Sequence, residues 1–390
     1  MRIGIFSDTY YPEINGVATS VFELRNGLLA EGHKVFVFTV SNSDAKLNDK
    51  SERNVYRVPS IPFATLKERR IGFPNSVKYM NIIERLKLDV IHTQTEFSVG
   101  SLGKRAARKF NIPLVHTYHT LYEDYIHYLK IPKNDFTFSL VGKFVKNFTN
   151  NCDLIIVPTD KVVNSMHEYK VTKPVKVIPT GLDLDKFQNV DQDHVAQIRK
   201  KYNLNTSDLV LSSIGRISQE KILDQIISHF DQLSGMFPDV KLFIVGDGPG
   251  KEELEKLSSE LGLTDRIIFT GYVDWNNIQD YYAAGDIFVS ASESETQGLT
   301  YSEALAAGLP LLVKDDTCLK NVLKHKQNGY GFIDQSDFIQ GFIFIKNKLA
   351  QNPAWGTEGP FYSRQDFITS VIGTYAELSE NYDQAEAAIL

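Results

Sequence analysis

Cysteine is scarce in this chain of 390 residues, and long apolar runs are missing from it. Only two cysteines occur, Cys152 and Cys318, and their spacing matches neither a disulfide framework nor a metal motif. They are typical of a reducing compartment such as the cytoplasm. No apolar run reaches the roughly 18–20 residues that cross a bilayer. The first residues, MRIGIFSDTYYPE, lack a basic segment followed by a long apolar one, so we expect no signal peptide.

The composition excludes further classes of protein. Hydrophobic residues make up 42% of the chain and charged residues 23%, a globular balance that excludes a disordered, collagenous or coiled-coil chain. The net charge of −6 hides an uneven distribution, since residues 1–190 carry +7 and residues 191–390 carry −13. The two halves therefore meet different surroundings, and we expect no nucleic-acid partner.

Apolar segments alternate with amphipathic helical patterns through the first half. One helix is predicted by apolar residues at i, i+4, i+7 and i+11 from Val17 to Leu28. The strands predicted in this half are Arg2–Ser7, Lys34–Val40, Asp89–Thr93, Pro113–Thr117 and Asp153–Pro158. Continuous apolar strands joined by helices indicate a parallel sheet that is covered on both faces.

The same alternation restarts after a break at Pro179–Gly181. The strands predicted in the second half are Leu209–Ile214, Lys241–Val245, Arg266–Thr270, Ile287–Ser290 and Pro310–Val313. We therefore predict an α/β protein with two doubly wound Rossmann-like domains, at residues 1–187 and 188–364. An apolar pattern near the end predicts a last helix, at residues 365–390, which we expect to cross back to the first domain.

Two loops of the second half carry groups that suit an anion, at the strand ends where open α/β sheets bind ligands. Gly215 and Arg216 directly follow LVLSSI, and Lys221 comes five residues later. A guanidinium fork and a compact ammonium of this kind can meet at a phosphate. Gly246 and Gly248 follow KLFIV and allow a backbone to approach a ligand closely. A solvated loop and a tight strand-to-helix turn are the structural alternatives.

The segment SASESETQGLTYSEALAAG contains two glutamates at a fixed spacing, Glu295 and Glu303. Glu295 precedes a glycine turn and can accept hydrogen bonds from sugar hydroxyls. The backbone N–H groups of Gly298, Leu299 and Thr300 would open a helix toward a phosphate. Glu303 is placed to accept the 2′- and 3′-hydroxyls of a ribose. Alternatively, acidic residues near a helix start stabilise its dipole, and Glu303 is then an ordinary surface position.

Together these features resemble the large family of retaining glycosyltransferases with the GT-B fold, in which two Rossmann-like domains face each other across a cleft. The resemblance covers nearly the whole chain. It is carried by NGV at Asn15–Val17, HTYH at His116–His119, GR…K at Gly215–Lys221, GDGP at Gly246–Pro249 and the two glutamates at Glu295–Glu303.

The resemblance implies two sets of site residues. One set would be catalytic and comprises His119, Arg216, Lys221 and Glu295. The other would bind the donor and comprises Gly16, Val17, Gly215, Arg216, Lys221, Gly246, Gly248, Glu295, Gly298, Leu299, Thr300 and Glu303. In the family the cationic pair neutralises the donor diphosphate, the first glutamate holds the donor sugar and the second holds the ribose. Gln297 stands where the family commonly has phenylalanine, so an amide replaces aromatic packing at this position.

Longer stretches resemble a subgroup, the bacterial 1,2-diacylglycerol 3-glucosyltransferases. These stretches are SDTYYPEINGVATSV, HTQTEFSVG, HTYHTLYEDYIHY and ETQGLTYSEALAAGLP. The subgroup implies retaining transfer of glucose from UDP-glucose to diacylglycerol, giving the α-glucolipid that anchors or precedes lipoteichoic acid. Another UDP-hexose such as UDP-galactose, a second hexose added to a glycolipid acceptor, and a soluble polysaccharide transferase stay open. A sugar-nucleotide epimerase and a non-catalytic partner subunit are the alternatives from other classes.

A lipid acceptor requires a surface that faces an anionic membrane. Residues 61–90 have a basic excess, and the tentative membrane contacts there are Lys67, Arg69, Arg70 and Lys78. The apolar stripe Tyr79, Ile82, Ile83 and Leu86 is either core or part of this docking face. The tentative acceptor wall consists of Tyr118, Tyr122 and Tyr125, with a partly buried aromatic loop as the alternative. We expect a cytoplasmic protein, peripheral on the inner face of the cell membrane.

The sequence indicates no metal and no other cofactor. Asp183-Leu184-Asp185 has the form of a metal–nucleotide motif, but it lies in the crossover between the domains, where we expect the two acids to cap turns. No carboxylate stands in a motif typical of a glycosidase nucleophile. The charged residues instead favour a dissociative, same-face substitution, stabilised electrostatically as the diphosphate departs. The sequence predicts nothing about the oligomeric state.

Overall fold

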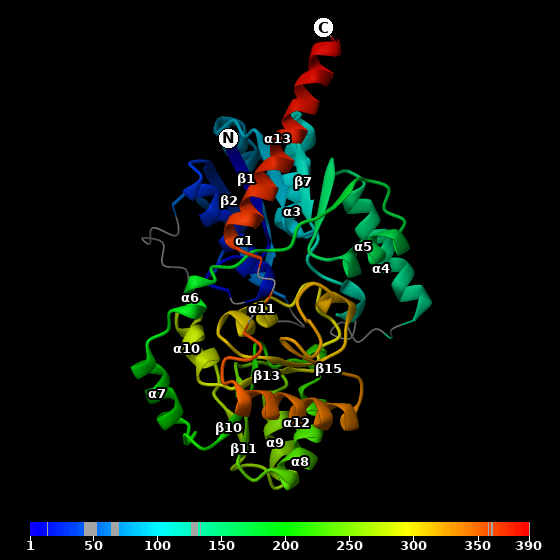
Figure 1. Ribbon diagram of the computed structural model, residues 1–390. Coiled ribbons are helices and arrows are strands. Elements are labelled where there is room, and N and C mark those ends of the chain that lie inside the picture. The colour runs from blue at the N-terminus through cyan, green and yellow to red at the C-terminus, as the bar shows by residue number, and fades with distance from the viewer. Residues whose placement is uncertain are drawn as a thin grey trace. The chain divides into compact units, whose positions relative to one another are not determined.

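The computed structural model describes residues 1–13, 15–42, 53–63, 70–125, 132, 134–357, 359 and 362–389, without the side chains of residues 76 and 383–389 (Figure 1). The chain forms two compact units. One unit consists of Met1–Gly181 with Tyr362–Leu390, and the other consists of Leu182–Phe361.

The first unit is built on a parallel sheet of seven strands in the order β3-β2-β1-β6-β7-β8-β9. Its strands are β1 (Arg2–Phe6), β2 (Lys34–Val40), β3 (Val55–Val58), β6 (Val90–Thr93), β7 (Leu114–Thr117), β8 (Leu154–Val157) and β9 (Val175–Val177). All the strands predicted for the first half are present, within about a residue of their predicted ends. β3 and β9 were not predicted, because they are short edge strands with polar residues in VYRV and VKV.

Helices cover both faces of this sheet (Figure 1). They are α1 (Gly16–Ala30), α2 (Ser76–Leu86), α3 (Ser98–Phe110), α4 (Asp135–Thr149), α5 (Asp160–Glu168) and α13 (Arg364–Ile389). The predicted apolar positions of α1, Val21, Leu24 and Leu28, lie in the core. Two short strands, β4 (Ser60–Pro62) and β5 (Arg70–Gly72), pair antiparallel beside the main sheet.

Helix α13 packs along α1 within this unit, as the red helix in Figure 1 shows. Arg364 forms an ion pair with Glu23 of α1. A Cβ on Gly27 would lie 2.2 Å from Ile368, so only glycine admits the helix this closely. The acidic C-terminal segment therefore belongs to the first unit. Counted over the whole sequence, the first unit carries a net charge of +4 and the second −10, a smaller contrast than the division at residue 190 indicates.

The apolar stripe of α2 is core. Tyr79 and Ile83 are buried, and Ile82 and Leu86 pack against the same cluster. The Tyr79 hydroxyl donates to the Arg57 carbonyl at 2.9 Å. Of the two alternatives for this stripe, core is therefore the correct one, because the same periodicity serves the sheet that α2 covers.

The second unit is built on a parallel sheet of six strands in the order β12-β11-β10-β13-β14-β15. Its strands are β10 (Leu209–Ile214), β11 (Val240–Val245), β12 (Ile267–Phe269), β13 (Ile287–Ser290), β14 (Leu311–Lys314) and β15 (Gly329–Phe332). Its helices are α6 (Asp185–Gln188), α7 (Gln192–Lys201), α8 (Leu223–Met236), α9 (Lys251–Glu260), α10 (Ile278–Ala283), α11 (Leu299–Ala306) and α12 (Gln335–Gln351). Short 3₁₀ turns include η2 (Tyr122–Asp124) in the first unit and η4 (Gln219–Lys221) in the second.

Strand β10 is the switch point of this sheet, since the chain continues to β11 on one side and β13 lies on the other. Connections leave such a point in opposite directions and open a crevice at the carboxyl ends of the two strands. The loops after β10 and β13 therefore meet at one edge of the sheet. No helix of the described residues is long and apolar enough to cross a membrane.

Candidate active site

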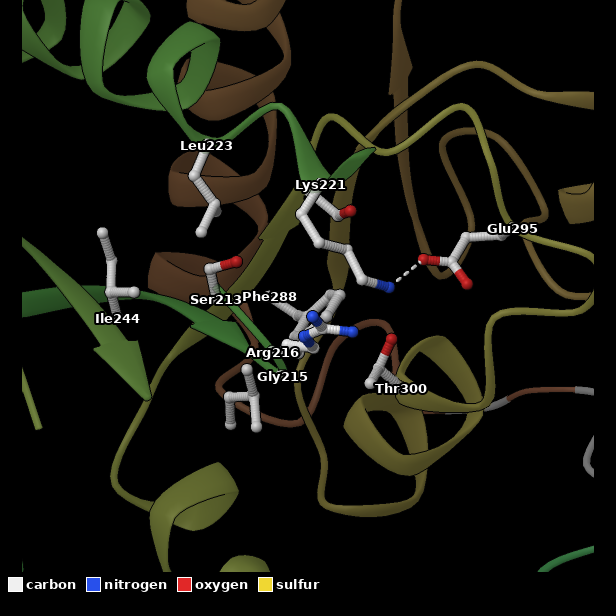
Figure 2. A pocket seen from close by; sticks show the side chains of 11 residues that line it. Ser213, Gly215, Arg216, Lys221, Leu223, Ile244, Phe288, Glu295 and Thr300 are labelled. Carbon is white, nitrogen blue, oxygen red and sulfur yellow. Dashed lines mark hydrogen bonds and ion pairs between the residues drawn. The ribbon is translucent and has the colours of Figure 1, made fainter. Parts of the chain in front are cut away.

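A pocket opens at the carboxyl ends of β10 and β13, entirely within the second unit (Figure 2). The residues that line it are Ser213, Ile214, Gly215, Arg216, Lys221, Leu223, Ile244, Phe288, Ser290, Glu295 and Thr300. The sequence analysis placed five of these in the site: Gly215, Arg216, Lys221, Glu295 and Thr300. Separate loops bring them together because their strands are neighbours in the sheet.

Lys221 and Glu295 form an ion pair across the pocket, drawn as a dashed line in Figure 2. Lys221 ends the turn η4, while Glu295 lies on the loop after β13. Both side chains are partly shielded from water, with exposed fractions of 28% and 16%. Figure 2 also shows Arg216 between Lys221 and Thr300. Two cations and one carboxylate therefore meet at the pocket. The cations suit a bound anion, and the carboxylate suits a hydroxyl-bearing group that is joined to this anion.

The loop after β11 supports the Arg216 loop and does not line the pocket. A Cβ on Gly246 would lie 1.9 Å from the Gly215 carbonyl oxygen, and one on Gly248 would lie 2.2 Å from that of Ile217. Gly246 has φ +138°, in the region that glycine favours. These glycines therefore allow two loops to pack closely. This agrees with the alternative that the Gly246–Gly248 segment is a tight strand-to-helix turn. Their contact with a donor stays a prediction.

Helix α11 begins beside the pocket. Gly298 has φ +71°, and a Cβ there would lie 2.3 Å from the ring of Tyr301, so the turn requires glycine. Thr300 lines the pocket, while Gly298 and Leu299 are not among the lining residues. The first backbone N–H groups of a helix have no partner within the helix and favour negative charge. Helix α11 therefore starts at the pocket beside Arg216, and its contact with a phosphate stays a prediction.

Glu303 lies inside the second unit and does not line this pocket. Its side chain is buried, at 3% exposure, and its Oε2 accepts a hydrogen bond from the Tyr282 hydroxyl at 2.6 Å. Burial, and then the Glu303 carboxylate, raise the pKa of Tyr282. The alternative that Glu303 is an ordinary surface residue is wrong. The role of Tyr282 was not predicted from the sequence. The only signal for a packed aromatic residue was its position in a short helical sequence, DYYA, that follows a turn.

The first unit holds a polar cluster at the carboxyl ends of β6 and β7. Nε2 of His119 lies 2.7 Å from Oε1 of Gln94. Burial, and then the charge of His116, lower the pKa of His119 to about 3, so its imidazole is neutral at physiological pH. Gln94 was missed as a partner of His119, although it directly follows the buried strand VIHT.

Glu96 is the centre of a second set of contacts in this cluster. It is buried, it lies 3.0 Å from Nε2 of His116, and it accepts a hydrogen bond from the Tyr122 hydroxyl. Tyr118 is buried in the core, with its ring 6.0 Å from that of Tyr122. Tyr118 therefore belongs to a buried aromatic loop, which was the alternative to the acceptor wall, and it is not exposed to an acceptor. Tyr122 and Tyr125 are half-buried.

The remaining predicted residues lie apart from these clusters. Gly16 begins α1, which Asn15 caps by accepting the Ala18 N–H at 3.0 Å, and Val17 follows in the first turn. Arg70 donates to the Ser60 carbonyl at 2.9 Å and so supports the β4–β5 pair. Lys78 is exposed on α2. Lys67 and Arg69 lie outside the described residues.

The acids of the proposed metal motif lie at the start of the second unit, where Asp185 begins α6. Within the described ranges, no group of three or more histidine, cysteine, aspartate or glutamate side chains is placed to hold a metal ion.

Family models match both units of the chain. The model described as Glycosyltransferase Family 4 matches residues 14–186, and the one described as Glycosyl transferases group 1 matches residues 195–342. The alpha-monoglucosyldiacylglycerol synthase of Streptococcus pneumoniae is 39% identical over 346 residues, which are 88% of this chain and 78% of that protein. The chain belongs to glycosyltransferase family 4. A protein of the same name from Acholeplasma laidlawii is 37% identical over 362 residues, 90% of this glycosyltransferase and 89% of the relative.

Solved structures show the same fold at low identity. The Anabaena protein HepE, in complex with UDP and glucose, matches this glycosyltransferase with a TM-score of 0.77 over 97% of this chain and 100% of that one, at 17% identity. The expected GT-B fold, with two Rossmann-like sheets, is confirmed, and so is the resemblance to a glycosyltransferase.

Proposed function

We propose that this glycosyltransferase transfers glucose from UDP-glucose to 1,2-diacylglycerol and forms α-monoglucosyldiacylglycerol. The observation that carries the proposal is the identity of 39% and 37% to two alpha-monoglucosyldiacylglycerol synthases over about nine tenths of the chain. The pocket chemistry agrees with it, because cations for a diphosphate lie beside a carboxylate for sugar hydroxyls.

The donor would lie across the pocket of the second unit. Arg216 and Lys221 bind the diphosphate, together with the helix start at Thr300. Glu295 accepts hydrogen bonds from the glucose hydroxyls. Its ion pair with Lys221 supports this role, because the phosphate that bears the sugar would bind at Lys221. Glu303 holds the ribose, as the family resemblance implies.

The reaction proceeds on one face of the sugar. The bond between the anomeric carbon and the β-phosphate oxygen breaks, and the acceptor hydroxyl oxygen bonds to that carbon. The acceptor's proton passes to the departing phosphate oxygen. Arg216 and Lys221 stabilise the negative charge that develops on the diphosphate, and one such preorganised group contributes about 10²–10³-fold to the rate. These charges come from the chain itself, so the proposal requires no metal and no other cofactor.

His119, Gly16 and Val17 belong to the first unit, and the family resemblance implies that they also contact the donor. With its pKa lowered to about 3, His119 is a neutral hydrogen-bonding group toward the donor sugar and holds no proton to transfer as an acid.

Diacylglycerol resides in a bilayer, so we place the enzyme peripherally on the inner face of the cell membrane, with an anionic membrane surface as its partner. The first unit, with its net charge of +4, is the one that faces the lipid.

Labelled donors and defined acceptors test this function. The protein is incubated with radiolabelled UDP-glucose or UDP-galactose and with liposomes that contain diacylglycerol or monoglucosyldiacylglycerol, and the lipids are separated by chromatography. We expect one labelled lipid, formed from UDP-glucose and diacylglycerol, with one UDP released for each lipid formed. Label only in a diglycosyl lipid, label only in a water-soluble glycan, or epimerised UDP-sugar without transfer would each overturn the proposal.

A further inference from the structure

Helix α4 presents a row of large apolar side chains to solvent. Phe136, Leu140 and Phe144 are spaced by four residues and so lie on one side of the helix. Their exposed fractions are 71%, 48% and 41%, and that of Phe97 is 52%. The Phe97 ring stacks on Phe144 with ring centroids 5.9 Å apart. These four side chains, which we call the α4 face, form a connected group, and such groups are uncommon on a surface that meets only water.

The opposite side of α4 already belongs to the core. Val145 is buried, and Phe138 and Val141 of the same helix pack against the core cluster that contains it. The α4 face is therefore not the core side of an ordinary amphipathic helix. It is a second apolar side, and nothing within the first unit's described residues explains it.

Basic side chains surround this face. Lys143 lies on α4 within the exposed row, and Lys146 lies beside it. Lys104 joins the two helices, since its Nζ lies 4.5 Å from the ring centroid of Phe148. Together α3 and α4 contain six basic residues and a single acidic one, Asp135. Two further acids of this region, Glu96 and Glu123, accept hydrogen bonds from tyrosine hydroxyls.

The α4 face also continues into the polar cluster of the first unit. The ring of Tyr122 lies 5.8 Å from that of Phe97 and 5.7 Å from that of Phe144. The hydroxyl of the same tyrosine donates to Glu96. A lipid that reaches the face thus meets Tyr122, one of the residues that the sequence assigned to the acceptor.

We propose that the α4 face docks on an anionic lipid bilayer, with its aromatic and leucine side chains in the interfacial layer and Lys143 and Lys146 at the headgroups. Phenylalanine and leucine framed by lysine are typical of helices that lie in a membrane interface. A second copy of this chain would bring the same positive charge and would be repelled. The proposal rests on the proposed function, because a diacylglycerol acceptor is what requires the enzyme to reach a bilayer.

This surface differs from the one that the sequence analysis indicated. That region also has exposed apolar side chains, among them Ile61, Ile71 and Phe73. They lie on or next to β4 and β5, whereas the α4 face lies on α4 and the start of α3. Substitutions in the two regions can therefore be compared directly.

Vesicle binding tests the docking face without any substrate. The full-length protein is mixed with vesicles of phosphatidylcholine and phosphatidylglycerol that lack diacylglycerol, and the bound fraction is measured by flotation. We expect Phe136→Ser with Leu140→Ser to weaken binding by about tenfold or more, because apolar area leaves the interface. Lys143→Gln with Lys146→Gln should weaken it about 25-fold, at roughly fivefold for each charge, and this effect should fade as salt rises.

Matched substitutions elsewhere serve as controls. Met236→Ser removes a similarly exposed apolar side chain from α8, and Lys200→Gln with Lys201→Gln removes two exposed charges from α7. These controls should bind vesicles like the wild type. All of the substituted side chains are on the surface, and an unchanged circular dichroism spectrum and Tm verify the fold.

A short-chain, water-soluble diacylglycerol separates docking from the reaction. We expect the α4-face variants to glucosylate this acceptor like the wild type, while they lose activity on diacylglycerol in vesicles. Wild-type vesicle binding by both double variants would overturn the docking proposal, as would a change in oligomeric state without a change in vesicle binding. If the wild type glucosylates neither form of diacylglycerol, the proposed function fails, and the flotation result still decides whether the face binds lipid.

Discussion

Replacing Lys221 with alanine removes the cation that we place on the donor diphosphate. The same substitution leaves Glu295 without its ion-pair partner, on the edge of the pocket that the diphosphate would enter. Both consequences weaken the binding of the diphosphate, and both destabilise the negative charge that develops on the diphosphate as it leaves. We expect kcat/KM for UDP-glucose to fall by about 10²–10³-fold.

The expected loss of transition-state stabilisation can be calculated in two ways. Losing one preorganised group that stabilises a developing negative charge costs about 2.7–4 kcal/mol. A lone carboxylate about 5 Å from a phosphate charge, at an effective dielectric constant near 20, is repelled by about 3 kcal/mol. These are two descriptions of one missing positive charge and do not add. Partial exposure of Lys221 and Glu295, at 28% and 16%, places the loss at the lower end of this range.

The assay measures UDP release at steady state, together with the Kd of UDP by calorimetry. Lys241→Ala is the matched control, because Lys241 pairs with Asp208 at 3.5 Å at the amino-terminal end of the same sheet. A second substitution, Glu295→Gln, separates two roles of Lys221. If Lys221 only neutralises Glu295, the double variant will regain the activity of Glu295→Gln alone. That recovery, or a wild-type kcat/KM for Lys221→Ala, would refute the diphosphate role.

Three further predictions concern stability. Tyr282→Phe removes a hydrogen bond to the buried Glu303 carboxylate. It should lower the free energy of unfolding of the second unit by about 1–3 kcal/mol in a urea titration. An unchanged urea midpoint would mean that Glu303 has sufficient hydrogen-bond partners without the Tyr282 hydroxyl. Gly246→Ala would force a Cβ to within 1.9 Å of the Gly215 carbonyl and should cost about 2–4 kcal/mol, which an unaltered Tm would contradict. Folding lowers the pKa of His119 to about 3, so the unfolded chain takes up a proton below about 6.5 that the folded chain does not, and stability falls as the pH drops. Between pH 6.5 and 5 this residue should account for about 1.6 kcal/mol, and His119→Asn should flatten that slope.

The central strands of the two main sheets were predictable from the sequence, whereas three of their four edge strands were not. Buried parallel strands are continuous apolar runs, and Lys34–Val40, Leu209–Ile214 and Ile287–Ser290 have the predicted bounds. Strand β15 was missed because GYGF contains two glycines, which strands usually avoid. Its Gly329 is explained only by the fold, since a Cβ there would lie 2.4 Å from the Leu311 carbonyl oxygen.

Several residues of the pocket were predictable from the sequence, but their arrangement in space was not. Arg216 and Glu295 follow different strands, and one sequence does not state that those strands are neighbours. Whether the two glutamates of the motif share a pocket depends on the turn of α11, which directs Glu303 inward to Tyr282. No local pattern contains that contact.

Apolar periodicity left the role of the α2 stripe open for a physical reason. A core face and a membrane face are both apolar, so periodicity alone does not distinguish them. The stripe of α2 packs under the sheet, while α4 has apolar residues on both sides and exposes one of them. Only burial in the folded unit separates the two cases.

The stereochemistry of the first lipid product tests the central claim most directly. The protein is supplied with UDP-glucose and diacylglycerol liposomes, the glycolipid is purified, and its linkage is determined by nuclear magnetic resonance of the anomeric proton and by digestion with α- and β-glucosidases. We predict a single glucose in α linkage to the free hydroxyl of diacylglycerol, removed by the α-glucosidase alone. A β-linked product, or glucose released to water while diacylglycerol remains unchanged, would contradict the account.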